Sequence, residues 1–573
     1  VKSDGITEDE FSVISSDESV VSVEQDGSLV VLTANAEGNA QVTFTSGEDP
    51  ALFKVLSVTV QEGFTMPSAT YGDLFPLTTP FAGQQNAYLD GLLTLTFDDA
   101  PTLGTSGEVR IYKQSDDSIV DVISMGGDID ALGYHGQDKL RHVNYLPIKV
   151  EGNQLIVKPH NNVLEYGESY YVAISDGLVT DASLNSQLFN GLGKTANWTF
   201  TTREAAPTGT HLLVDDDGEA DFRSLQGALN YVMENLPKDQ PATITLRDGE
   251  YEELLFLRNQ NNVTIQGESR DNTLVYYANY DSLNSGSGKS SPVGATVAEG
   301  GRSVFLVEGA DNLTLHNFTL KNTHTRSNAY SNQAEALYFN NDDGRLSAVN
   351  MNFISEQDTL QLKGYSWFYE TLVAGNVDFI WGYVNTALFE NSEIRTIGDS
   401  KNGNPDEDTA GGYVLQARVP DIDHKGFIFL NSRFTNGPGP LGNGVLDNST
   451  YIARSGGSEA ARHAVGRMAA GTAPVLRRRG RGRGGCRCFL LCRRPRRLAG
   501  RSGRRLRRCG TRRHPCASSV CGDQPGPAHP ARRDCDYCRN LDLDGAGGRL
   551  VSCVRRRRII SFPRENQFSN ATR

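Results

Sequence analysis

The first 458 residues of this chain contain no cysteine, because all nine cysteines lie between Cys486 and Cys553. Disulfides therefore cannot stabilise the larger part of the chain, and its fold has to depend on hydrophobic burial. The sequence also lacks an apolar run long enough to cross a bilayer, so we expect no membrane span. It opens at Val1 with no recognisable signal peptide. We interpret this as the removal or omission of an upstream segment.

Basic residues are scarce before residue 459, and acidic residues are scarce after it. Residues 1–458 hold 27 Lys and Arg against 62 Asp and Glu, whereas residues 459–573 hold 29 Arg, no Lys and seven acidic residues. The net charge of −13 is thus an average over two unlike segments. An acidic, cysteine-free body gives no reason to expect a nucleic acid partner. It suits a secreted or cell-surface bacterial protein.

The arginine-rich segment from residue 459 to residue 573 has three interpretations. Its runs of arginine could bind nucleic acid, and Cys535 with Cys538 could form half of a zinc site. The absence of lysine and the irregular spacing of the other cysteines favour a third interpretation. Out-of-frame translation of GC-rich DNA yields this mixture of Arg, Gly, Pro, Ala and Cys. We therefore interpret residues 459–573 as a frameshift product and expect them to be disordered.

Short alternating segments with turn residues between them fill the first 205 residues. In residues 1–62 the strand-like segments are 11–15, 20–23, 29–33, 40–44 and 55–60. In residues 63–205 they are 93–98, 107–112, 155–159, 170–174 and 198–202. This spacing predicts two β-sandwich domains, and both resemble the Ig-like modules of bacterial surface proteins. We expect them to act as spacers or glycan-contacting arms, with their aromatic residues in the core.

After a linker at residues 205–209, one short pattern recurs. An Asn is followed three places later by an apolar residue, with a polar residue at the second place, in the copies that begin at Asn262, Asn317, Asn350, Asn376, Asn391 and Asn431. The irregular spacing predicts a parallel β-helix, whose coils share strands but differ in loops. Alternation places the second position outward. The residues predicted to share this outward row are Thr264, Thr319, Asn352, Asp378, Glu393 and Arg433.

Two short apolar strings each carry one aspartate. They are Gln357-Asp358-Thr359-Leu360 and Asp378-Phe379-Ile380-Trp381-Gly382. A carboxylate beside Phe and Ile is costly to desolvate unless it has a partner, so such a residue is often functional. Gln333 falls about one coil before Gln357, and Arg454 follows some coils later. Stacking would therefore assemble two carboxylates, two amides and one guanidinium on one face.

These motifs resemble those of the pectin methylesterases, in the same order. They appear as Gly249-Glu250-Tyr251-Glu252-Glu253, Gln333-Ala334-Glu335-Ala336-Leu337, the two aspartate strings and Arg454. The segment Asp216–Leu229 is similar to the first strand and capping helix of that family. The resemblance covers residues 211–458. It implies an all-β protein in which a right-handed parallel β-helix at residues 206–458 follows the two Ig-like domains.

The resemblance implies hydrolysis of the methyl esters of galacturonan, with pectin as the polysaccharide partner and methanol as a product. By motif, Asp378 is the nucleophile, and Asp358 is the acid that later activates water. Gln333 and Gln357 would stabilise the oxyanion, and Arg454 would favour the ionised form of Asp378. Asp358, which we expect to have no guanidinium of its own, would hold its proton longer. Tyr251, Glu253, Trp367 and Trp381 are the predicted substrate-binding residues. We expect no metal, no cofactor and a monomer.

One departure from the family pattern leaves other functions open. The family continues its arginine motif as Gly-Arg-Pro-Trp, whereas this chain has Ala453-Arg454-Ser455-Gly456 and lacks that sugar-stacking tryptophan. An esterase or thioesterase for a non-pectin ester is one alternative. A non-catalytic glycan-binding surface protein is another, although it would have little reason to keep both aspartates, both glutamines and the arginine. A β-helix lyase would need a cluster of calcium-binding acids that the repeats do not provide.

Overall fold

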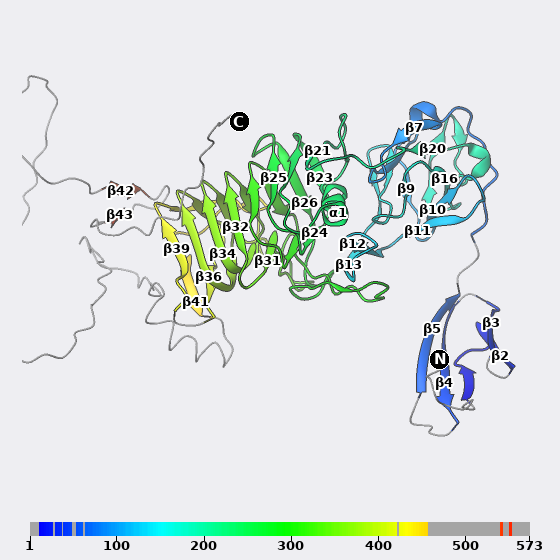
Figure 1. Cartoon of the computed structure of the whole chain (residues 1–573), viewed down its shortest axis with the longest axis horizontal. Helices are drawn as coiled ribbons and strands as arrows, with labels where there is room; N and C mark the ends of the chain where they lie inside the picture. The colour runs from blue at the N-terminus through cyan, green and yellow to red at the C-terminus, as the bar shows by residue number, and fades with distance from the viewer. Residues whose placement is uncertain are drawn as a thin grey trace, which may run out of the picture.

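The computed structural model describes residues 11–26, 29–36, 38–47, 53–60, 64–420, 423–455, 539–542 and 549–552. These residues are mostly β-strand, and the single α-helix among them is α1 (Leu225–Asn235). Figure 1 shows the strands in successive blocks along the chain. In the tail, β42 (Arg539–Asp542) and β43 (Arg549–Ser552) pair antiparallel. The rest of residues 459–573 lies outside the described residues, so its disorder stays a prediction.

The first domain contains the five strands that the alternating pattern predicts. They are β1 (Phe11–Ser15), β2 (Val21–Asp26), β3 (Leu29–Ala34), β4 (Gly38–Ser46) and β5 (Phe53–Val60). Strands β1, β4 and β5 form one antiparallel sheet, and β2 pairs with β3. Val20, Val21, Ala40 and Val42 form the small core between them.

The second domain is a larger sandwich of two main sheets. The five-stranded sheet has the order β11 (Ile119–Ser124), β10 (Glu108–Lys113), β16 (Ser169–Ile174), β20 (Thr199–Thr202), β7 (Gln84–Ala87). The four-stranded sheet has the order β14 (Ile148–Glu151), β15 (Gln154–Val157), β8 (Leu93–Thr96), β6 (Thr78–Thr79). Trp198 is buried between them, as predicted, and its indole N–H donates to the carbonyl of Pro80.

Smaller elements complete the second domain. They are the 3₁₀ turns η1 (Phe75–Leu77) and η2 (Lys194–Ala196) and the short strand pairs β9 (Thr102–Leu103) with β17 (Val179–Thr180), and β18 (Ser183–Leu184) with β19 (Gln187–Leu188). A hairpin of β12 (Asp128–Leu132) and β13 (Lys139–Tyr145) belongs to neither main sheet. Strand β13 instead pairs with β27 (Ser291–Pro292), which lies far along the chain. The second domain and the next one therefore share a sheet.

The third domain is the predicted parallel β-helix, and each of its coils runs along three walls. The first wall contains β24 (Leu255–Arg258), β28 (Phe305–Glu308), β31 (Leu337–Asn340), the start of β34 (Leu360–Tyr369), the start of β36 (Ile380–Glu390), β38 (Tyr413–Arg418) and β41 (Tyr451–Ser455). The second wall contains β21 (His211–Val214), β22 (Ala242–Leu246), β25 (Val263–Gly267), β29 (Leu313–His316), β32 (Arg345–Val349), the ends of β34 and β36, and β39 (Gly426–Leu430).

The third wall is a seven-stranded parallel sheet. It contains β23 (Gly249–Glu252), β26 (Thr273–Tyr277), β30 (Thr319–Asn322), β33 (Asn352–Ile354), β35 (Leu372–Gly375), β37 (Glu393–Ile397) and β40 (Arg433–Gly437). Strands β34 and β36 differ from their neighbours because each continues from the first wall into the second without a loop. The bend in β34 falls at Gly364, whose φ is +59° and where a Cβ would lie 2.5 Å from two carbonyl oxygens. Only glycine fits such a corner.

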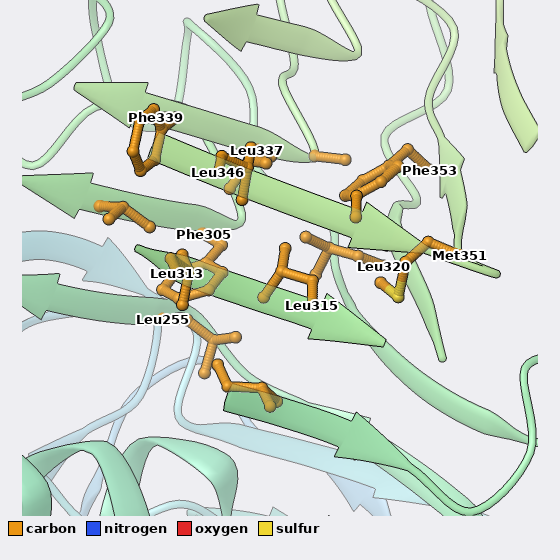
Figure 2. Packing of buried hydrophobic residues seen from close by; sticks show 14 of the residues in the cluster. Leu255, Phe305, Leu313, Leu315, Leu320, Leu337, Phe339, Leu346, Met351 and Phe353 are labelled. Carbon is orange, nitrogen blue, oxygen red and sulfur yellow. The ribbon is translucent and has the colours of Figure 1, made fainter. Parts of the chain in front are cut away.

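The interior of the β-helix is a set of aligned apolar rows. In the first wall, Leu255, Phe305, Leu337, Leu360 and Ile380 lie directly beside one another on successive strands. Figure 2 shows the start of this row together with Leu313 beside Leu346 and Leu320 beside Phe353. Burying such a side chain contributes about 1.5–3 kcal/mol. The apolar third position of the repeat thus forms the core, as predicted.

The predicted outward row is correct for four members and wrong for two. Thr319, Asn352, Glu393 and Arg433 belong to one register row of the third wall, which Leu372 completes. In these copies the preceding Asn has a positive φ and turns the corner into the strand, as at Asn317 and Asn350. Thr264 lies on the second wall instead. Asp378 is itself the residue with positive φ at its corner, so it precedes a strand and does not belong to the predicted row.

The N-terminal end of the β-helix is covered by α1 and the second domain. The Ser224 hydroxyl caps α1 by accepting from the amide of Gly227. Asp90 of the second domain accepts from the amides of Arg223 and Ser224, at 2.9 and 2.8 Å. The hairpin adds Leu132 and Val143 to a buried cluster with Phe256, Leu306 and Tyr338, among others. This domain is therefore docked on the β-helix, not suspended from it as a spacer.

Candidate active site

Asp358 and Asp378 occupy the same corner of two successive coils, where the third wall turns into the first. Asp358 precedes β34, and Asp378 precedes β36. Their φ values are +63° and +49°, a conformation that Asp tolerates better than most residues. Leu360 pairs with Ile380, and the amide of Asp358 donates to the carbonyl of Val377 at 3.0 Å. The two aspartates are thus neighbours across one strand spacing, as the sequence predicts.

Asp378 is almost fully buried and is paired with the predicted arginine. The Arg454 Nε donates to Oδ1 of Asp378 at 2.7 Å, and its second nitrogen contacts Oδ2. Gln416 adds a contact from Nε2 to Oδ2 at 3.4 Å. Gln416 and Arg454 are themselves neighbours, because β38 pairs with β41 in this register. A two-point guanidinium contact fixes the direction of the carboxylate as well as compensating its charge.

Asp358 is also buried, but its surroundings differ from the prediction. We expected it to lack a guanidinium, whereas the Arg302 side chain lies 3.4 Å from its Oδ2. Arg302 is shared with Glu335, at 2.9 Å from Nε, and with Asp281, at 2.7 Å. Burial raises the pKa of Asp358 well above its usual range, and the charges of Glu335 and Asp378 raise it further, against the opposing effect of Arg302 and Arg454. Burial and the neighbouring acids therefore favour the protonated form of Asp358, whereas the expected lack of a guanidinium does not hold.

The two predicted glutamines lie beside the aspartates. The amide of Ala334 donates to the carbonyl of Gln357, which stacks Gln333 and Gln357 on adjacent coils. Both side chains are half-buried. Within the described ranges neither side-chain amide has a hydrogen-bond partner in the protein. Two free amide donors beside two carboxylates suit the stabilisation of an oxyanion.

Of the two predicted tryptophans, one belongs to the site. Trp381 pairs with Gln416 across β36 and β38, in the same row as Arg454. Its indole N–H is buried and has no partner in the described part of the protein. Trp367 lies on the second-wall half of β34, is 39% exposed and donates to Glu390 at 3.1 Å. The structure gives it no contact with the aspartates.

Tyr251 and Glu253 do not have the surface that a substrate-binding residue needs, and this corrects the prediction. Tyr251 is buried in the core of the β-helix, and its hydroxyl lies within hydrogen-bond distance of the carbonyls of Val214 and Arg247. Glu253 is buried, and its carboxylate accepts from the first two amides of α1. Both residues therefore stabilise the first coil. Glu253 does so by satisfying helix donors that would otherwise be unpaired.

Sequence reasoning missed Arg302, Glu335 and Gln416. Glu335 was visible as an acid between two alanines within a quoted motif. Nothing in the local sequence marks Arg302 or Gln416, because their contacts depend on coil register and loop path.

The described residues contain one candidate cation group, Asp215, Asp216 and Asp217, whose carboxylate oxygens lie within 4.8 Å of one another. Two of these carboxylates already accept backbone amides, from Gly218 and Glu250. The group is distant from the aspartate pair in the fold, on the first coil. In the same described ranges, no helix is long and apolar enough to cross a membrane.

Comparison with known proteins finds similarity in three parts of the chain. Residues 211–455 match the Pectinesterase family model, residues 76–202 a bacterial Ig-like domain, and residues 2–55 a bacterial Ig-like domain of group 2. Pectinesterase 1 of Olea europaea is 27% identical over 232 residues, which are 39% of this chain and 56% of that protein. A pectinesterase of Ralstonia solanacearum is 25% identical over 278 residues, 46% of this chain and 67% of that protein. The chain spans about half the length of the first curated relatives it matches.

Solved structures are similar over the same region. The pectin methylesterase of Yersinia enterocolitica has 29% identity and a TM-score of 0.32, over 41% of this chain and 70% of that one. Pectin methylesterase PemA of Erwinia chrysanthemi has 24% identity and a TM-score of 0.34, over 44% of this chain and 71% of that one.

The fold and the site define a class: a parallel β-helix protein with a pair of buried aspartates at one corner of adjacent coils, preceded by Ig-like domains. Within that class, residues 211–455 of this chain are similar to the pectinesterases.

Proposed function

We propose that this protein hydrolyses the methyl esters of pectin, with Asp378 as nucleophile and Asp358 as acid and then base. The observation that carries the proposal is the unlike setting of two adjacent carboxyl groups. Asp378 has a two-point guanidinium partner, whereas burial and neighbouring acids favour the protonated form of Asp358. Two carboxyl groups in such unlike settings are suited to different steps of one reaction.

In the first step the Asp378 carboxylate attacks the ester carbonyl carbon, and a carbon–oxygen bond forms. Gln333 and Gln357 supply N–H donors to the resulting oxyanion. The bond to the methoxy group then breaks, the proton of Asp358 passes to the departing oxygen, and methanol leaves. An acid anhydride with Asp378 remains.

In the second step water attacks the galacturonate carbonyl of that anhydride. Asp358, now ionised, takes the proton of the water and returns to its starting state. The bond to Asp378 breaks, and the carboxylate of Asp378 is restored together with a galacturonic acid group, which releases the second proton of the water to solvent and becomes a carboxylate. We assign the half-buried ring of Trp381 to the polysaccharide, since it lies in the same row as Gln416 and Arg454. Action on an extracellular polysaccharide also implies a secreted or cell-surface protein.

Methanol release from highly methylated galacturonan tests the proposal. The full chain should release methanol, and Asp378→Asn should lower the rate at least about 10³-fold, because the nucleophile is lost. Asp311→Asn is the matched control, since it makes the same change in the same domain at an exposed pair with Arg345. Equal rates for Asp378→Asn and Asp311→Asn would overturn the assignment of the nucleophile. No release by the unmodified chain, with release from another ester, would move the substrate to a non-pectin ester.

A further inference from the structure

One side chain of the second Ig-like domain enters the β-helix completely. Arg141, on β13, has no exposed surface. Its guanidinium donates to the carbonyls of Gly300 (3.0 Å), Gly301 (3.1 Å), Ser303 (2.5 Å), Val304 (3.1 Å) and Leu255 (2.6 Å), all in the β-helix domain. No carboxylate contacts it directly. Burial of a cation is costly, and here carbonyl oxygens of one short segment supply nearly all the compensation.

The segment that Arg141 holds, residues 300–304, carries Arg302 at its centre. The Arg302 side chain points away from Arg141 and toward the acid side of the site, where it contacts Asp281, Glu335 and Asp358. The same segment is tied to the next coil, because the amide of Val304 donates to the carbonyl of Glu335 at 2.9 Å. A continuous set of hydrogen bonds therefore runs from the Ig-like domain to Asp358.

The interface between the second Ig-like domain and the β-helix is closely packed in one part and contains a cavity in another. Beside α1 it encloses a cavity of about 810 Å³, lined in part by Asn161, Asn162 and Asn230. The Asn230 side-chain amide donates to the side-chain oxygens of Asn161 and Asn162, so these three residues link the two domains across the cavity. On the side of Arg141, by contrast, the interface is filled by the apolar cluster and the β13–β27 pair. The close-packed part of the interface is the part that leads to the site.

We propose that the second Ig-like domain is a working part of the catalytic site, because Arg141 fixes segment 300–304 and thereby places Arg302 against Glu335 and Asp358. The inference rests on the proposed function. Arg302 is a positioning residue, since it acts through Asp358 and Glu335 and not on the ester. Arg141 acts one step further away, through the backbone that carries Arg302.

The route from Arg141 through segment 300–304 and Arg302 to Asp358 is tested by the kinetics of four forms of the full chain. They are the unmodified protein, Arg141→Lys, Arg302→Lys and the double variant. Lysine is of similar length but cannot make the same set of hydrogen bonds. We expect each single variant to lower kcat for methanol release by about tenfold, with KM within about twofold, because misplacement of a catalytic group affects the chemical step. The double variant should be no worse than Arg302→Lys alone, since both changes act through one contact.

Arg258→Lys is the matched control for the interface. Arg258 is on β24 and forms an ion pair across the same interface with Asp138, at 2.5 Å, but does not touch segment 300–304. We expect its kcat to stay within about twofold of the unmodified chain. The route is wrong if Arg141→Lys lowers kcat by the same factor with and without Arg302→Lys. It is also wrong if a folded Arg141→Lys variant keeps its full kcat.

Two further measurements test the proposal if Arg141→Lys does not fold or if the unmodified chain is inactive. Where Arg141→Lys fails to fold, Val143→Ala loosens the same strand more gently. Unchanged kcat in both Val143→Ala and Arg302→Lys would then overturn the proposal. If the unmodified chain releases no methanol, the proposed function fails. Hydrogen exchange then tests by itself whether Arg141 fixes segment 300–304. Faster exchange at the amides of Val304 and Phe305 in Arg141→Lys than in Arg258→Lys supports the fixing of this segment by Arg141. Equal exchange in the two variants overturns it.

Discussion

Asp358 and Asp378 lie one coil apart, yet the side chains that hold them come from opposite directions along the β-helix. Asp358 is supported from the N-terminal side by Arg302 and Glu335, whose side chains are 11% and 0% exposed. Asp378 is supported from the C-terminal side by Gln416 and Arg454, and the Arg454 side chain is 42% exposed. The surroundings of Asp358 are therefore built into the interior, whereas Asp378 depends on a partly exposed side chain.

Core packing follows the same gradient. Phe368 is fully buried and stacks on Phe389 at 4.5 Å. Two coils later, Phe434 is only partly buried against Phe429. Along β39 and β40 the side chains alternate between half-buried and exposed. The core is therefore packed more closely in the coils that carry the two aspartates than in the coil of β39 and β40.

The largest expected difference concerns stability. Phe368→Ala should lower the free energy of unfolding of the β-helix by about 3–5 kcal/mol, because it leaves a cavity in a closed core. Phe434→Ala should cost about 1 kcal/mol, since part of its ring already faces solvent. Urea unfolding followed by the fluorescence of Trp367 and Trp381 measures both. Equal losses would remove the packing difference between the two ends.

At Arg454, in contrast, we expect a large effect on kcat and a small effect on the free energy of unfolding. Arg454→Met should lower kcat for methanol release by about 10²–10³-fold, because the buried carboxylate of Asp378 loses its two-point partner. The free energy of unfolding should change less than it does in Phe368→Ala, since the Arg454 side chain is 42% exposed and its removal leaves no core cavity. Arg433→Met, which breaks an exposed pair with Glu393, is the control. A loss of kcat below about threefold in Arg454→Met would mean that Asp378 does not need this partner.

The Ig-like domain at the N-terminal end should make stability depend on pH. Burial lowers the pKa of His160, but its hydrogen bond to Asp121 and the other nearby carboxylates outweigh this and raise the pKa to about 9. A raised folded-state pKa stabilises the protein fully below pH 6.5, and the effect is lost as pH rises toward 9. We expect a loss of up to about 3 kcal/mol over that range, measured by Trp198 fluorescence in urea. The variant His160→Asn should flatten the dependence.

The smallest expected effect concerns the surroundings of Asp358 alone. Glu335→Gln removes a negative charge that raises the pKa of Asp358, so that pKa should fall. The alkaline limb of the pH profile for kcat/KM should move to lower pH by about one unit, because the acid loses its proton earlier. Glu393→Gln, on the third wall, should leave the limb in place. An unmoved limb in Glu335→Gln would show that Glu335 has no part in setting the acid.

Much of the fold was predictable because β-helix coils repeat the same local chemistry. The Asn corners and their apolar third positions predicted the walls, and both aspartates were found by their apolar neighbours. The register failed at Asp378, where the corner residue is the aspartate itself and the Asn lies two places earlier. Arg302 could not be found, because its place depends on the path of a long loop and on Arg141 from another domain. Tyr251 and Glu253 were misassigned because motif order does not report burial.

The loop-free bend of β34 and β36 has a consequence for protein engineering. Neighbouring coils turn between the first and second walls through short connections, such as residues 309–312 between β28 and β29. Those connections are natural points for grafting a peptide or fusing a reporter domain. The two strands that follow the aspartates have no such point, because any added residue would shift the pairing of a continuous strand and turn its side chains over. In these two coils an insertion is therefore disfavoured between the first and second walls, whereas the coil of Asp378 still carries the long connection 398–412 after β37.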